Sequence, residues 1–173
     1  MTRFAACVVL LCVVSPASYA DWRIDAFSKA QALMRQFEEK EAALMTELSP
    51  ETKEFFALWL PARESRRRIE DLAFRWHLDH DAASVAWDNP LVWSQGVQSS
   101  DDEKRLVAED ADFSKAYEDY RVKRALLLSH KELFKIRNAA HERQKELFQK
   151  LEFDLQTQLN LLQREVDKNK KII

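Results

Sequence analysis

Glycine is almost absent from this chain of 173 residues, in which Gly96 stands alone. A dinucleotide-binding fold, a phosphate-binding P-loop and the nucleophile elbow of a hydrolase each need several glycines at fixed places. The sequence excludes all three sites. Serine, histidine and acidic residues are present, but no group of them has a recognisable catalytic arrangement. We therefore predict that the protein is not an enzyme and has no cofactor.

Cysteine is also scarce, since Cys7 and Cys12 are the only two in the chain. Both lie in residues 1–20, where a positive start at Arg3, an apolar run over residues 4–14 and small residues at the end are typical of a secretory signal peptide. Removal of that segment would leave no thiol for a disulfide, a thiolate metal site or a cysteine nucleophile. Export without disulfides fits the bacterial periplasm, which we predict as the location.

Long apolar runs and an excess of one charge are missing as well. A helix that crosses a bilayer needs about 20 apolar residues, and no segment after residue 20 provides them. The 27 basic and 29 acidic residues leave a formal net charge of −2, so the surplus of cations that nucleic acid attracts is lacking. We therefore expect a protein partner, which can be a second copy of the chain.

The residues that are present favour helices. Ala, Glu, Lys, Leu and Arg make up about half of residues 21–173, a composition typical of long helices. The fold class that we predict is all-α, with a single domain over residues 21–173 that forms an elongated helical hairpin or bundle. The first helix covers residues 21–48. The second covers residues 50–87, begins with Ser49 as its cap and Pro50 in its first position, and is kinked at Pro61.

The third helix is predicted over residues 101–168, after a capping box at Ser100, and a break near Asp110 with Asp112 as a cap is the alternative. As one helix, residues 113–168 would span about 84 Å, roughly twice the diameter of a compact domain of this size. Either the segment bends back without glycine or its outer half protrudes, and we expect the second. The protruding half would then present an apolar face to an oligomer or a partner. That face consists of Leu151, Leu155, Leu159, Leu162 and Val166.

Two histidines form the candidate metal site. His77 and His80 lie three residues apart, and this spacing places both imidazoles on one face of a helix. With a carboxylate from a neighbour they could bind zinc or copper. The ordinary interpretation is that they meet the free carbonyl groups at the end of a helix. Binding or sensing of a metal ion in the periplasm is therefore our alternative function.

The connection after the second helix is the candidate binding loop. It contains Trp93, and apolar side chains in such a connection either plug the hairpin or form a contact patch. The residues that we assign to this patch are Trp87, Leu91, Val92, Trp93 and Val97.

The second helix also carries a strongly basic face. Ion pairs across solvated helix faces are the ordinary interpretation of this pattern, and a strip that binds anions is the sharper one. The residues concerned are Arg63, Arg66, Arg67, Arg68 and Arg75.

Two pentapeptides resemble the Leu-Thr-x-x-Gln box of the periplasmic Spy/CpxP-type helical chaperones and stress sensors. They are LSPET at residues 48–52 and, as a weaker match, LNLLQ at residues 159–163. Thr52 stands where the box has glutamine, and the cap and proline of a helix start produce the first pentapeptide by themselves. We therefore assign the chain to no family. Our first hypothesis is a non-catalytic, chaperone-like or target-specific protein that binds its partner through apolar helix faces and the Trp93 loop.

Overall fold

The protein is all-α, as predicted. The computed structural model describes residues 17–80 and 100–171, and within these ranges it has six helices and no strand. The helices are α1 Ala17–Thr46, α2 Pro50–His80, α4 Ser100–Glu109, α5 Ala111–Ser129, α6 Lys131–Arg143 and α7 Lys145–Lys170.

The first two helices form a hairpin whose turn follows the predicted chemistry. Pro50 begins α2, and Oγ of Ser49 accepts a hydrogen bond of 3.3 Å from the backbone N–H of Thr52. The buried hydroxyl of Thr52 donates to the carbonyl oxygens of Met45 and Ser49, at 2.6 and 2.7 Å. The helix then runs through Pro61 to His80, so no break occurs at the proline. Residues 81–87 of the predicted second helix lie outside the described residues.

Replacement of Pro61 with alanine should stabilise the protein. Pro61 is exposed inside α2, where a proline lacks one hydrogen-bond donor and crowds the preceding turn. Alanine favours a helix interior by about 3 kcal/mol over proline, although local relaxation and the larger entropy of the unfolded variant offset part of this. We expect a free energy of unfolding about 1–2 kcal/mol higher for P61A, measured by urea denaturation. A lower value would show that α2 needs the proline geometry to pack.

The predicted single helix over residues 101–168 is wrong. The segment contains four helices, which are separated at Asp110, His130 and Gln144. The side chain of Asp110, rather than that of Asp112, caps α5 by accepting a hydrogen bond of 2.8 Å from the N–H of Phe113.

The other two breaks need no glycine. His130 has φ −97° and ψ 50°, and Gln144 has φ −116° and ψ 28°. Both φ angles are negative and therefore open to any L-residue. Short hydrogen-bonded turns close the chain on either side of each break, for example from the N–H of Leu133 to the carbonyl of His130 at 3.0 Å. Each break thus loses few hydrogen bonds.

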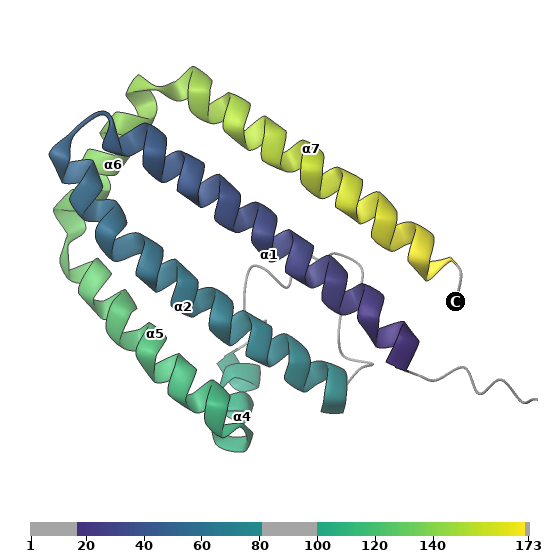
Figure 1. Cartoon of the computed structure of the whole chain (residues 1–173). Coiled ribbons are helices and arrows are strands. Elements are labelled where there is room, and N and C mark those ends of the chain that lie inside the picture. The colour runs from purple at the N-terminus through teal and green to yellow at the C-terminus, as the bar shows by residue number, and fades with distance from the viewer. Residues whose placement is uncertain (1–16, 81–99, 172–173) are drawn as a thin grey trace, which may run out of the picture.

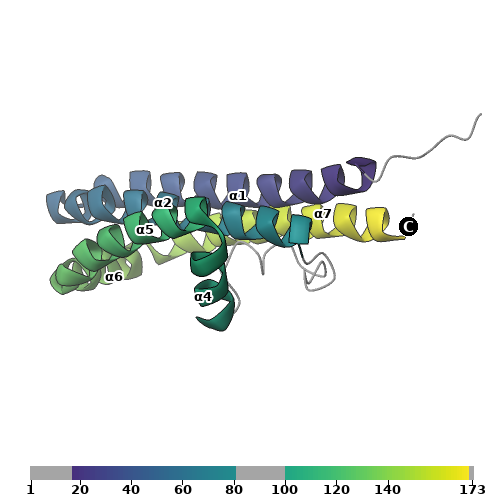
Figure 2. The same ribbon diagram turned by 90° about the horizontal axis from the view of Figure 1, so that it is seen from below.

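These breaks fold the segment around the hairpin. In Figure 1 the helices lie side by side in the order α7, α1, α2, α5, and α6 crosses near the turn of the hairpin. Figure 2 shows the same array from below, with α4 projecting away from the other helices. The outer half of the segment therefore packs on the chain itself instead of protruding.

Burial of apolar side chains explains why the segment folds back. The largest core cluster lies at the turn end of the hairpin and joins five helices. Its buried members are Ala42, Met45, Phe55, Phe56, Ala62, Leu127, Leu133, Ala140 and Phe148. On α7 alone, four large side chains are buried, which contributes about 6–12 kcal/mol. Two helix breaks at about 1 kcal/mol per lost hydrogen bond do not outweigh that gain.

Candidate functional site

The candidate binding site lies along the line where α1 packs against α7, which we call the seam. Ala26 and Ala30 of α1 are buried against Leu162 and Val166 of α7, where the small alanine side chains let the helices approach closely. Leu159 is buried as well.

This packing corrects one predicted site. Leu159, Leu162 and Val166 were assigned to an oligomer or partner face, but helix α1 of the same chain covers that part of α7. Leu151 and Leu155 are half-buried, and they line a groove on the outer side of the seam. A partner face therefore remains a prediction for these two leucines only.

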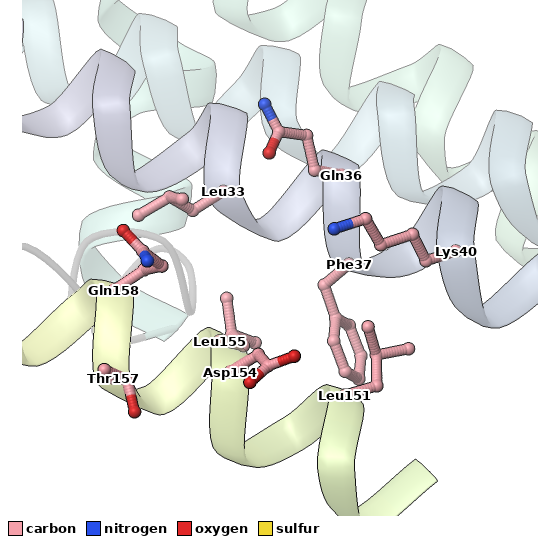
Figure 3. Close-up of a pocket in the computed structure, with 9 residues that line it drawn as sticks. All are labelled: Leu33, Gln36, Phe37, Lys40, Leu151, Asp154, Leu155, Thr157 and Gln158. Carbon is pink, nitrogen blue, oxygen red and sulfur yellow. The ribbon is translucent and has the colours of Figure 1, made fainter. Parts of the chain in front are cut away.

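The groove consists of three adjoining hollows between α1 and α7, with volumes of about 350, 340 and 320 Å³. Neighbouring hollows share lining residues, so they follow one another along the seam of α1 and α7. Figure 3 shows the middle hollow, in which the ring of Phe37 reaches from α1 to the side of Leu151 and α7 contributes Leu155 from the opposite wall. The other residues that line this hollow are Leu33, Gln36, Lys40, Asp154, Thr157 and Gln158.

The two ends of the groove differ in charge. At the end near the hairpin turn, Lys40 and Lys150 border a hollow of aliphatic side chains. Neither lysine forms an ion pair or hydrogen bond with the other described residues. At the opposite end, the ammonium group of Lys29 is neutralised by Asp25 at 2.8 Å and by Glu165 at 3.2 Å. The groove thus has one positive end.

Large apolar side chains of the groove remain in contact with solvent. Leu147 is 47% exposed at the positive end and Leu161 is 52% exposed at the other. Neither Leu161 nor the α1 wall of the groove was predicted from the sequence as part of a site. A usable signal was present, because Ala26, Ala30, Leu33 and Phe37 follow the same alternation of four and three residues as the buried positions of α7.

Buried ion pairs hold the helices that carry the groove. The carboxylate of Glu38 on α1 is 3% exposed and lies 2.9 Å from Nε of Arg63 on α2. It also pairs with Arg67, and Glu41 pairs with Arg137 of α6. Arg63 and Arg67 of the basic face of α2 are therefore used in ion pairs with a buried carboxylate. The ordinary interpretation predicted the ion pairing but not its burial.

A polar hollow of about 540 Å³ lies over α2, between α1 and α5. Most of its charges are already neutralised. Arg75 pairs with Asp71 at 3.1 Å and Lys123 with Asp119 at 2.8 Å. The hydrogen bonds from Lys123 and Ser65 also hold the pKa of Asp119 below its ordinary value. The hollow therefore offers little unpaired charge to an anion.

One buried acid has a strongly shifted pKa. Burial of Glu70 on α2 raises the pKa of its carboxyl group to about 7, and the hydrogen bond from Arg66 opposes this shift. The two side chains lie 2.8 Å apart, and the Glu70 side chain is 2% exposed. Glu70 is enclosed by the helices and lines none of the hollows of the groove. Its shift bears on stability rather than on binding there.

The candidate metal ligands have separate partners in the structure. Nε2 of His77, which is buried, lies 3.1 Å from the carboxylate of Asp102 on α4. Nδ1 of His80 lies 2.9 Å from the carbonyl oxygen of Trp76, and the two rings stack. Within residues 17–80 and 100–171, no three His, Cys, Asp or Glu side chains are grouped as a metal site would need. Nothing here supports the metal hypothesis.

The predicted binding loop cannot be placed. Trp87, Leu91, Val92, Trp93 and Val97 all lie outside the described residues. Among the helices that are described, none has the length and apolar character to span a membrane.

Neither a family model, nor a curated protein, nor a solved structure matches this chain.

Proposed function

We propose that this protein binds an apolar segment of another protein in the groove between α1 and α7, without catalysing a reaction. The single observation that carries the proposal is the row of adjoining hollows along this seam, with half-exposed leucines at both ends. Burial of an exposed leucine contributes roughly 1.5–3 kcal/mol, so a few such contacts can support specific binding. The signal-like pattern of residues 1–20 supports the bacterial periplasm as the location of this activity.

The groove is better suited to binding than to chemistry. Its lining combines aliphatic and aromatic side chains with a few amides and charges. Such a surface buries apolar groups and orients them through its polar edges. The residues that line it include no histidine or cysteine, and the acid with the strongly raised pKa lies elsewhere.

A matched pair of variants tests this function. Leu161 lies in the groove and Leu126 on the outer side of α5, and each is 52% exposed. We expect the purified protein to suppress the aggregation of reduced insulin B chain in a saturable way, measured by light scattering. L161D should weaken this suppression at least fivefold because it places a charge in the groove. L126D should leave the suppression unchanged.

Two outcomes would overturn the proposal. One is an equal loss of aggregation suppression in L161D and L126D, which would assign the activity to the general hydrophobicity of the surface. The other is a stable dimer that L161D, but not L126D, converts to a monomer, measured by light scattering after size exclusion. In that case a second copy would occupy the groove.

A further inference from the structure

We propose that the occupant of the groove is one amphipathic helix of about four turns, with an acidic residue near the end that meets Lys40 and Lys150. This inference rests on the proposed function and specifies the partner's chemistry.

The walls of the groove favour a helix over an extended chain. Both walls are helices, and the described residues contain no strand to which an extended peptide could add. An extended segment in this groove would leave backbone N–H and C=O groups without partners, apart from the few that Gln36, Thr157 and Gln158 could satisfy. A helix satisfies its own backbone and presents only side chains to the walls.

The neighbours of α7 leave room for another helix. Helix α1 packs against both α2 and α7, and α5 packs against α2, whereas α7 has α1 as its main neighbour. An additional helix in the groove would contact α1 and α7 together, just as α1 itself contacts α2 and α7. The length of the occupant follows from Leu147 and Leu161 at the two ends of the groove, which are about 21 Å apart along α7 at 1.5 Å per residue. That distance corresponds to a helix of about 15 residues.

Charge sets the direction of the occupant. Lys40, Lys150 and Asp154 line the hollow at the positive end, which leaves a surplus of one cation. The other residues of this hollow are aliphatic, namely Ala43, Leu44, Leu147 and Leu151. A carboxylate on the occupant would meet that cation next to apolar surface, where exclusion of water strengthens the attraction.

Synthetic peptides of 16 residues test the inference by fluorescence anisotropy. The first is an amphipathic helix with leucines every three or four residues and glutamates at one end. The second has lysines in place of the glutamates. The third has the composition of the first, but its leucines alternate with polar residues as in a strand. We expect saturable binding of one acidic helix per protein molecule, at least tenfold tighter than binding of either other peptide.

Charge reversal of the groove provides the matched control. The double variant K40E/K150E should prefer the lysine peptide to the acidic peptide. The double variant K53E/K115E makes the same change in net charge at exposed residues outside the groove, and it should retain the original preference. Circular dichroism checks that both variants remain folded.

Each remaining outcome contradicts a defined part of the inference. Equal affinity for the acidic and lysine peptides would contradict the role of Lys40 and Lys150. Equal affinity for the alternating peptide would contradict a helical occupant. Suppression of insulin aggregation without binding of any helical peptide would overturn this inference while the proposed function stands. Failure of both assays would overturn both.

Discussion

Replacement of Phe148 with alanine should lower the free energy of unfolding by about 3–5 kcal/mol, the usual cost of truncating a buried phenylalanine. Phe148 is completely buried in the cluster at the turn end of the hairpin. Its ring stacks on that of His141 with 4.0 Å between the ring centroids. Phe148 lies in the first turn of α7, directly after the break at Gln144. Its contacts therefore hold the start of α7 against the hairpin.

Phe153 provides the control on the same helix. This side chain is 71% exposed, so F153A should change the free energy of unfolding by no more than about 0.5 kcal/mol. Urea denaturation followed by circular dichroism measures both variants. Similar losses for F148A and F153A would contradict the packing of α7 on α1 and the hairpin.

The second large effect is that Glu70 makes the protein less stable as the pH rises. Burial raises the pKa of this carboxyl group to about 7, whereas an exposed glutamate titrates near 4.5. Between these values the folded protein holds a proton that the unfolded chain has released, so the free energy of unfolding falls as the pH rises. A pKa shift of this size corresponds to a change of about 3 kcal/mol in the free energy of unfolding. The stability is fully present below about pH 4.5 and is lost as the pH passes through about 7.

The variant E70Q isolates this contribution because its amide stays neutral. The difference in free energy of unfolding between E70Q and the unmodified protein should shift by about 2–3 kcal/mol in favour of the variant between pH 5 and pH 8. E132Q removes an exposed carboxylate of α6 and should show no such shift. A constant difference for E70Q over this range would show that Arg66 keeps the carboxyl group ionised throughout.

Local chemistry made much of the fold predictable. Scarce glycine and proline and the apolar spacing of residues 21–48 indicated helices, and Ser49 with Pro50 indicated where the second one starts. These signals depend on neighbouring residues only, so they can be recognised without knowing what the helix packs against.

The two breaks without glycine were harder to recognise. His130 and Gln144 stand at positions where the apolar stripe of the third segment would place an apolar side chain. Both lie inside the single helix that was predicted over residues 101–168, although each marks the end of one helix and the start of the next. A polar residue in such a stripe predicts a break only when the arms on both sides have something to pack against, and the sequence pattern does not contain that information.

The groove illustrates the same limit. Leu151 and Leu155 were predicted to belong to a partner face because they lie on an apolar stripe, and they line the groove. Leu159 and Leu162 belong to the same stripe and are covered by α1. Periodicity identifies the apolar side of a helix and does not tell how much of that side a neighbour covers. The lysines of the groove gave no sequence signal, because the sequence does not show that Lys40 of α1 and Lys150 of α7 line one hollow together with a single acid, Asp154.

Composition and local signals therefore determined that the described part of the chain is helical and that its first two helices form a hairpin. Only the tertiary structure decided where residues 111–170 turn back along the hairpin and which side of α7 is left uncovered by the other described helices. The physical reason is a difference in scale. One residue can leave the helical conformation for about 1 kcal/mol per lost hydrogen bond, whereas the two arms on either side gain several times more by packing on the hairpin.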